Sequence, residues 1–581
     1  MGGRYHLNLT LFHWSGKESQ PGTSRVACRP WGRALGLAVL VLAACGTSPG
    51  QERTIGLILN DSGAYNGYTL FAPLQYTVTY LIDNQGMKVH SWPGTSRPGL
   101  SVYLTENGQL LRTALVDARP PWPYISGGRI ELVDWDGTVT WAFDYADSTS
   151  CQHHDVCPMP NGNILMIAWD YKTRQEAIDA GRNPASAMFD LLPDKVVEVD
   201  PHTDSIVWEW RLWDHLIQDY DPDKVNFGVV RDHPELVDIN WTGSWVTVDW
   251  AHTNTVTYNA ELDQVMISPR NFSEVWVIDH STTTEEARGH TGGRYGRGGD
   301  LLYRWGNPAA YGRGTGQQQR LFCQHDAQWI AEGLPGAGNI LVFNNGMGRS
   351  AGIYSSVDEF SPPIDSLGFY HPRPDSTYGP DSATWSWRIG DELFSDHISG
   401  CERFPNGNTF ACAGPYGTFL EIRPAADLVW KYVNPVTAAG PQYQGYIMPY
   451  GENEVFKTRR YAPDYPGLAG RNLEPQGPIE RYGPGVAQPD RSVVQPGLRL
   501  AAGPMPTRGR SFVDYELPVA GTIDLAVFDL LGNRVKTLAC GRAAAGRHRA
   551  IWDASGMPSG AYFLALETGA DRQMRQFVIA R

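Results

Sequence analysis

The chain has 581 residues, of which 19% are charged, and its 48 basic and 62 acidic side chains give a formal net charge of −14. This balance argues against nucleic acid as a partner, because a negative protein repels the phosphate backbone. Gly (63), Pro (41) and Trp (20) are frequent, and no long amphipathic helical pattern is present. Such a composition is typical of many short strands joined by turns, so we expect an all-β protein with more than one domain.

Residues 1–45 have the features of a secretory signal. Three arginines between 25 and 33 precede an apolar run from 34 to 42, which is too short to span a bilayer. Small residues then lead to Cys45, as in the lipobox of a lipoprotein. We expect export, and two interpretations stay open: a lipid anchor on Cys45, or a plain cleavage site with an incidental cysteine.

Export permits disulfide bonds. Cys401 and Cys412 flank the turn at Asn406-Gly407, so the sequence predicts that they face each other across a hairpin. The remaining cysteines after the signal are a second candidate pair, Cys151 and Cys157, and two without an obvious partner, Cys323 and Cys540.

A repeat fills residues 55–460. Its closing half is an apolar strand, an acidic turn and a second strand that carries Trp, and a further hairpin precedes each copy. Units of about four strands at roughly 40–70-residue spacing predict a β-propeller, here with six blades and Glu454–Arg460 as the closing strand. Long insertions are expected to form loops that shape ligand access. The copies lie at 79–92, 130–141, 197–210, 275–305, 356–387 and 420–432, and the insertions at about 171–194, 214–246 and 288–299.

The C-terminal region differs from the repeat. Residues 461–497 are rich in Pro and Gly and are predicted to be a linker, and residues 498–581 to be a small immunoglobulin-like β domain. This domain resembles the modules related to flagellar hook-capping and to the C-terminal sorting domains of type IX secretion. The resemblance implies a location in the periplasm, at the outer membrane or on the cell surface. It rests on Asp529-Leu530-Leu531-Gly532, Gly546-Arg547-His548 and Ser559-Gly560-Ala561-Tyr562-Phe563.

Four histidine stretches fall at comparable places in successive copies. The first strand of each propeller blade lines the central channel, so we expect these side chains to converge on one site. The register is imperfect, because His154 lies six residues before Pro160 and His397 lies eight before Pro405. The stretches are His153-His154-Asp155, Asp249-Trp250-Ala251-His252-Thr253-Asn254, Gln324-His325-Asp326 and Asp396-His397-Ile398-Ser399.

One arginine is predicted to join the histidines. After the apolar strand 340–343 the chain passes through Asn344-Asn345-Gly346 to Arg349. A guanidinium on this return turn would hold a tetrahedral oxyanion by two parallel hydrogen bonds. The polar neighbours favour an oxyanion site over an apolar pocket.

These motifs resemble the bacterial arylsulfate sulfotransferases over most of residues 55–460. The resemblance implies an exported six-bladed propeller that moves a sulfuryl group from an aryl sulfate ester to a phenol. It implies a transiently sulfated histidine and no nucleotide sulfate donor; we expect no cofactor. By the same resemblance His397 is the nucleophile, and His252, His325 and Arg349 bind the sulfuryl oxygens. We further expect substrate contacts from His154, Asn254 and Asn345.

The residue types suit this chemistry. Neutral imidazole is a competent nucleophile near pH 7, and a nearby arginine would lower the pKa of the histidine further. Fixed cationic donors stabilise the charge on the transferring group, and a covalent intermediate predicts ping-pong kinetics. Trp and Tyr side chains on the insertions are expected to hold the aryl groups.

Other classes stay open. A propeller with a polar axis can be a non-catalytic extracellular module that binds a ligand or a protein. A metal site with His153, His154 and Cys157 as ligands is a further alternative, although no tight ligand spacing supports it. Tryptophan-rich propellers include quinone-dependent dehydrogenases, but the repeated histidines and the arginine favour an oxyanion site.

Overall fold

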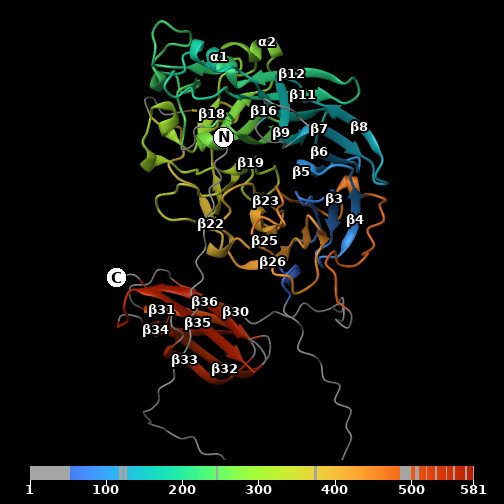
Figure 1. Cartoon of the computed structure of the whole chain (residues 1–581), viewed down its shortest axis with the longest axis vertical. Coiled ribbons are helices and arrows are strands. Elements are labelled where there is room, and N and C mark those ends of the chain that lie inside the picture. The colour runs from blue at the N-terminus through green and yellow to red at the C-terminus, as the bar shows by residue number, and fades with distance from the viewer. Residues whose placement is uncertain are drawn as a thin grey trace, which may run out of the picture. The chain divides into compact units, whose positions relative to one another are not determined.

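The computed structural model describes two stretches of the chain. They are residues 53–483, apart from 117–121, 123–126, 244–246 and 372–375, and residues 499–579, apart from 504–509, 518–519, 530–532, 545, 554–555 and 570–571. The predicted signal with Cys45 lies outside these residues. The described chain is all-β, with only short helices such as α1 (Arg174–Asp179) and α2 (Thr284–Ala287) (Figure 1). No helix in this described part is long and apolar enough to cross a membrane.

Antiparallel four-stranded sheets follow one another along the chain, as the repeat predicts (Figure 1). The second sheet contains β5 (Pro98–Leu104), β6 (Leu110–Leu115), β7 (Gly128–Val133) and β8 (Val139–Asp144). The third contains β9 (Ser150–Pro158), β10 (Ile164–Asp170), β11 (Asp194–Asp200) and β12 (Ser205–Arg211). The fourth contains β15 (Thr253–Asn259), β16 (Gln264–Pro269), β17 (Val275–Asp279) and β18 (Tyr303–Trp305). The fifth contains β19 (His325–Trp329), β20 (Ile340–Asn344), β21 (Ser356–Phe360) and β22 (Trp385–Arg388).

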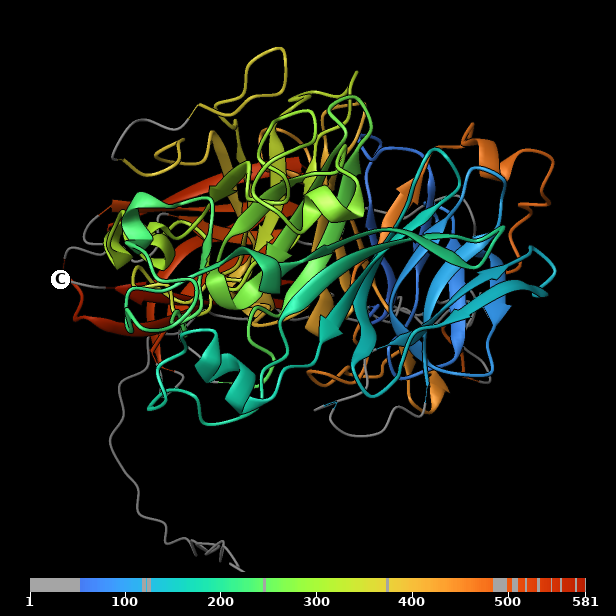
Figure 2. The ribbon, with the colours of Figure 1, turned by 90° about the horizontal axis from the view of Figure 1, so that it is seen from above.

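The two ends of this region exchange strands. The first sheet, β2 (Tyr68–Phe71), β3 (Val78–Ile82) and β4 (Lys88–Pro93), is completed by the late strand β29 (Arg459–Tyr461). The last, β23 (Gly400–Arg403), β24 (Thr409–Ala413), β25 (Thr418–Ile422) and β26 (Leu428–Val433), is extended by the early strand β1 (Gly56–Asn60). Figure 2 shows the late, orange segments beside the early, blue strands. The expected closing strand therefore pairs with β2, beginning at Arg459.

Apolar residues on both faces of a strand fill two different cores. In β10, Met166 packs with Leu111 of the preceding sheet, whereas Leu165 packs with Val256 of the following one. Successive side chains of a strand point to opposite faces, which explains the uninterrupted apolar run of β10. Comparable cores join the other neighbouring sheets, including the first and the last, where Phe71 packs against Phe419.

The disulfide predictions are wrong. In the register of the hairpin Cys401 lies opposite Ala411, while Cys412 lies opposite Gly400. This offset of one residue places the two thiols on opposite faces of the sheet, in different cores. Cys151 and Cys157 share strand β9 and are roughly 20 Å apart along it, beyond the reach of about 7 Å for a disulfide. The described cysteines are all free: Cys151, Cys157, Cys323, Cys401, Cys412 and Cys540.

The start of the predicted linker packs on the sheets. The hydroxyl of Tyr465 donates to the carbonyl of Leu104 over 2.8 Å, and Leu468 is buried beside Leu104. Residues 461–483, the first part of the predicted linker, therefore lie against the sheets and are held there by buried apolar side chains such as Leu468.

The C-terminal part contains two antiparallel sheets that share a core around Leu525, Trp552 and Leu564. One sheet contains β30 (Arg499–Gly503), β31 (Arg510–Leu517) and β34 (Gly546–Asp553). The other contains β33 (Arg534–Ala543), β32 (Gly521–Phe528), β35 (Gly560–Thr568) and β36 (Arg572–Ile579).

Candidate active site

β-bulges occur at one repeated position in the innermost strands. In β9 the pairing with β10 is interrupted between Gln152 and Val156, and β15 and β19 show the same kind of shift after Thr253 and His325. His154 and His252 have positive φ angles, 53° and 52°, which non-glycine residues seldom adopt. Bulges and strained backbone redirect side chains and are common beside functional sites.

The bulges bring three of the predicted histidines together. The rings of His154 and His252 are 4.7 Å apart, centroid to centroid. Phe456 contacts both His154, at 6.0 Å, and His325, at 6.4 Å. His154, His252 and His325 come from successive sheets, as the repeat predicts, and we call them the histidine cluster.

The Nδ1 atom of each histidine in the cluster forms a hydrogen bond within the protein. Nδ1 of His252 donates to Asp249 over 2.6 Å, and Nδ1 of His325 donates to Oδ1 of Asn345 over 2.7 Å. Nδ1 of His154 lies 2.7 Å from Nδ1 of His153, whose Nε2 donates to Asp194. These contacts assign the proton of each cluster member to Nδ1, so the neutral rings carry their lone pair on Nε2.

Burial sets the charge of this cluster. It holds the pKa values of His154 and His325 well below that of an ordinary histidine, and the positive charge of Arg270 lowers both further. These two rings are therefore neutral at pH 7, the state in which imidazole is a nucleophile or a base.

His397 has a different environment. Its Nδ1 donates to Asp396 over 2.5 Å and its Nε2 donates to Glu454 over 3.0 Å. Burial lowers the pKa of His397, but the hydrogen bonds to Glu454 and Asp396 outweigh it, and the net shift is upward. Two carboxylates thus stabilise the imidazolium form of His397, which differs from the expectation that an arginine would lower its pKa.

Asn345 connects His397 to the histidine cluster. Its Oδ1 accepts from His325, while its Nδ2 donates to the carbonyls of Ser395 and Ile398 over 2.9 Å each. Every hydrogen-bonding group of this buried amide is used by the protein. Asn345 therefore positions two predicted site residues.

Asn254 has a comparable position. Its Nδ2 donates to the carbonyl of Gln324 over 2.7 Å, and its Oδ1 accepts from the hydroxyl of Thr255. These bonds tie the start of β15 to the residue before His325. The amide thus fixes the spacing between two innermost strands.

Arg349 lies at the predicted return turn. Its guanidinium stacks on the rings of Phe322 and Tyr354, at 4.9 and 4.2 Å, and donates to the hydroxyls of Tyr354 and Ser356. Its Nε is buried and has no hydrogen-bond partner among the described residues. The Nε–H group of Arg349 is therefore available to donate a hydrogen bond to a bound anion.

Sequence reasoning did not find Arg270, and it named Asp249, Asp396 and Glu454 only within longer segments, without a role at the site. Arg270 comes directly after the second strand of its sheet, β16, and Arg349 five residues after the second strand of the next sheet, β20. The same criterion that led to Arg349, an arginine after a second strand, could have found Arg270. Glu454 lies in the predicted closing segment, 57 residues from His397, and no local motif connects the two.

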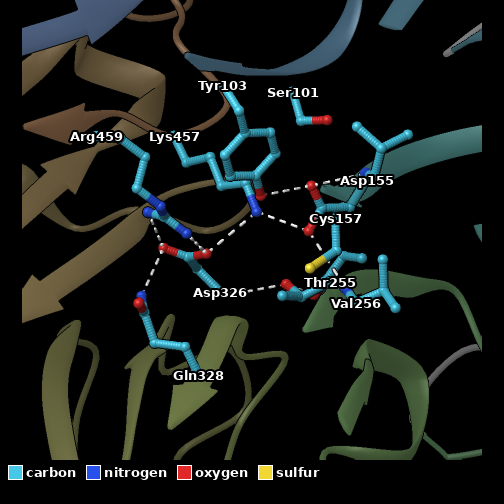
Figure 3. A network of polar contacts seen from close by, with 12 residues as sticks. Ser101, Tyr103, Asp155, Cys157, Thr255, Val256, Asp326, Gln328, Lys457 and Arg459 are labelled. Atoms are coloured by element: carbon cyan, nitrogen blue, oxygen red, sulfur yellow. Dashed lines mark hydrogen bonds and ion pairs between the residues drawn. The ribbon is translucent and has the colours of Figure 1, made fainter. Parts of the chain in front are cut away.

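A buried ionic network lies beside the histidine cluster (Figure 3). Lys457 donates to Asp155 over 2.7 Å and to Asp326 over 3.2 Å, and Arg459 forms two bonds with Asp326. The hydroxyl of Tyr103 donates to Asp155. These groups come from strands of different sheets and from the closing segment, so the network ties the sheets together at their inner edges.

The alternative metal ligands have other partners. His153 and His154 hydrogen-bond to each other, and the thiol of Cys157 lies 3.6 Å from the carbonyl of Pro158. Among the described residues their ligand atoms do not form a compact group of three.

The fold and the site together define a class: an all-β protein with a centre of histidines and arginines suited to an anionic group. A family model for arylsulfotransferase (ASST) matches residues 77–434, more than half of the chain, and the chain belongs to this family. Membership supports aryl sulfotransferase activity in general. A model for a secretion system C-terminal sorting domain matches residues 504–580 and indicates export and association with the cell surface or outer membrane.

Comparisons with individual proteins are less informative. No curated protein sequence matches the chain significantly. A protein of unknown function from Bacteroides caccae is similar with a TM-score of 0.35 and 11% identity, over 68% of this chain and 98% of that one. A periplasmic gluconolactonase from Pseudomonas aeruginosa has a TM-score of 0.33 and 9% identity, over 84% and 99%. Similarity at this level says nothing about activity.

Proposed function

We propose that the protein transfers a sulfuryl group from an aryl sulfate ester to a phenolic acceptor through a sulfohistidine, without a nucleotide sulfate donor. The observation that carries this proposal is the gathering of histidines from successive sheets, with their Nδ1 atoms held by protein groups, beside Arg270. Neutral imidazoles with a fixed tautomer supply nucleophiles, and the arginines supply positive charge for the sulfate group.

The proposed framework is a six-bladed propeller followed by an immunoglobulin-like sandwich. Support comes from the cores that join each sheet of the 55–461 region to the next and the last to the first. The strand exchange through β1 and β29 closes such a ring without an open edge. The C-terminal sandwich takes its two sheets from the strands around Trp552.

His397 is the proposed nucleophile, on the basis of the family resemblance, and Glu454 its proton partner. The imidazolium first releases its Nε2 proton to solvent through Glu454, 3.0 Å away. The freed lone pair forms the N–S bond as the bond from sulfur to the aryl oxygen breaks, and the departing phenolate takes a proton from solvent. In the second half, Glu454 takes the proton of the acceptor phenol, whose oxygen attacks sulfur as the N–S bond breaks, and then returns this proton to Nε2 of His397.

His252, His325 and Arg349 are the proposed ligands of the sulfuryl oxygens. The ring of His325, neutral and with its proton on Nδ1, accepts rather than donates at Nε2, so it must gain a proton to bind an anion. The incoming negative charge favours this gain because it stabilises the imidazolium. The unpartnered Nε of Arg349 supplies a further donor. His154, Asn254 and Asn345 line or support this site.

The test is a quenched reaction with 4-nitrophenyl sulfate followed by mass spectrometry of histidine peptides under alkaline conditions. We expect one added sulfuryl group on His397 and release of nitrophenol that depends on a phenolic acceptor at steady state. The variant His371→Gln, at an exposed histidine on another loop, should remain fully active. A sulfuryl group on His325 would transfer the nucleophile role to the cluster, and no nitrophenol release at all would refute the proposed activity.

A further inference from the structure

A second group of histidines lies outside the active site, on two insertions. His215 ends the 3-10 helix η1 (Leu212–His215) after β12, and His290 and Asp300 lie between β17 and β18. Nδ1 of His215 and Nδ1 of His290 are each 2.8 Å from the same oxygen, Oδ1 of Asp300. All three ligand atoms lie within 4.8 Å of one another. We propose that His215, His290 and Asp300 bind a divalent transition-metal ion, with Zn²⁺ the best match.

The contacts of His215 favour a positive charge between its Nδ1 and the carboxylate of Asp300. Its Nε2 lies 2.9 Å from the carbonyl oxygen of Ala287, which only accepts, so Nε2 carries a proton. In the neutral ring Nδ1 is then a lone pair, and it faces a carboxylate oxygen at 2.8 Å. Two acceptors at this distance repel unless a positive charge lies with them. A proton on Nδ1 would supply it, and so would a metal ion bound by both atoms.

The arrangement around His215 is the one that metal-binding histidines use. Such a histidine donates its second ring nitrogen to a carbonyl or carboxylate, which fixes the tautomer and the ring orientation. Here that partner is the carbonyl of Ala287 at the end of α2. The indole of Trp210 stacks on the ring at 5.6 Å with an interplanar angle of 3°, and its Nε1 donates to the carbonyl of Gly299.

The backbone next to Asp300 is shaped to let His215 approach. A Cβ on Gly299 would collide with the carbonyl oxygen of Ala287 and lie 2.6 Å from Nε2 of His215. Glycine is therefore required at this position. The loop is further held by hydrogen bonds from the amide of Gly298 to the carbonyl of Gly292 and from the amide of Gly299 to the carbonyl of Gly289.

The donor set and the exposure of the ligands favour a particular ion. Two imidazoles and one carboxylate suit Zn²⁺ and its neighbours in the first transition row, whereas Ca²⁺ and Mg²⁺ prefer all-oxygen sites. His215 is fully buried, but the side chain of His290 is 59% exposed, so solvent can supply the fourth ligand. The ion would connect insertions of two neighbouring sheets and stabilise them by an amount that grows with the logarithm of its free concentration.

The experiment measures zinc binding by full-length protein that carries no histidine tag. Chelator-treated protein is dialysed to equilibrium against Zn²⁺ and the bound metal is counted by mass spectrometry. We expect one zinc per chain for this site in the wild type, and an affinity at least about tenfold lower in His290→Gln, whose exposed position should not affect folding. Substituted Co²⁺ should give visible d–d absorption that the variant loses.

His371→Gln is the matched control, because His371 is an exposed histidine whose Nε2 lies 2.8 Å from one carboxylate, that of Asp365. It should bind zinc like the wild type. Asp300→Asn should weaken binding as His290→Gln does, with folding checked by circular dichroism. If the wild type binds no zinc at about 10 μM Zn²⁺, the group of His215, His290 and Asp300 is only a pair of charged histidines on a carboxylate, and the proposal is overturned. If His290→Gln and Asp300→Asn both bind zinc as tightly as the wild type, the zinc site lies elsewhere, and this result would also overturn the proposal.

Discussion

Asn345 accepts a hydrogen bond from Nδ1 of His325 over 2.7 Å and thereby fixes which nitrogen of this histidine bears the proton. The same amide donates to two carbonyls of the segment that carries His397. One side chain thus controls the tautomer of one predicted site residue and the position of another. In a group-transfer centre such control decides whether a ring is aligned to attack or to donate.

Replacement of Asn345 should therefore impair catalysis. In Asn345→Ala, His325 loses its acceptor and the carbonyls of Ser395 and Ile398 lose their donor, so we expect kcat to fall about 100-fold. Initial rates with 4-nitrophenyl sulfate measure this. Asn339→Ala is the control. Asn339 lies directly before the first residue of β20, whereas Asn345 lies directly after the last, and Asn339 hydrogen-bonds Glu359 and Ser361. Equal rates for both variants would remove Asn345 from the site.

Removal of Glu454 should change the pH dependence of the reaction. The pKa of His397 is raised, and attack needs the neutral ring, so wild-type kcat/KM should fall as the pH drops through this raised pKa. Glu454→Gln removes one of the two stabilising carboxylates and lowers the pKa of His397. The acidic limb of the pH profile should then move to lower pH, while kcat decreases because the proton carrier is lost.

Glu452→Gln is the control for this measurement. Glu452 lies two residues away and accepts a hydrogen bond from Tyr446, not from His397. Its profile should match that of the wild type. A limb that moves to higher pH in Glu454→Gln would contradict the assigned ion pair.

His280 should make stability depend on pH. Its Nε2 donates to Glu198 and its Nδ1 to Asp263, and although burial opposes the charge, these bonds raise the pKa of His280 to about 9. The contribution, at most about 3 kcal/mol, is complete below the ordinary pKa of 6.5 and disappears as the pH rises through 9. The melting temperature of the wild type should exceed that of His280→Gln at pH 6.5, and the gap should close near pH 10. A constant gap would contradict the pKa shift.

The sequence predicts most of the framework because local signals define it. The turn Pro160-Asn161-Gly162-Asn163 and the apolar run after it mark one hairpin, and equivalent signals recur in each copy. The same repeat predicts that His154, His252 and His325 approach one another, and the structure brings them together.

Features that depend on exact register or on chain closure are not visible in the sequence. A shift of one residue decides whether Cys401 faces Cys412 or points away from it, and no local pattern encodes that shift. The pairing of His397 with Glu454 exists because the closing segment returns past the last sheet to the first one, and residue spacing alone does not predict this contact. The charge state of His397 follows from that contact, so it was inaccessible as well.

The last prediction concerns Lys457, whose ammonium group is buried between Asp155 and Asp326. Lys457→Met keeps the volume of the side chain but leaves Asp155 without its cation, so we expect the free energy of unfolding to fall by about 3–5 kcal/mol. Thermal melting measures the loss. Lys224→Met, which breaks the surface pair with Asp179, should change the melting temperature too little to resolve. Adding Asp155→Asn to Lys457→Met removes the unpaired charge and should restore part of the stability. A double variant less stable than Lys457→Met would show that packing around Lys457, rather than its charge, stabilises this part of the protein.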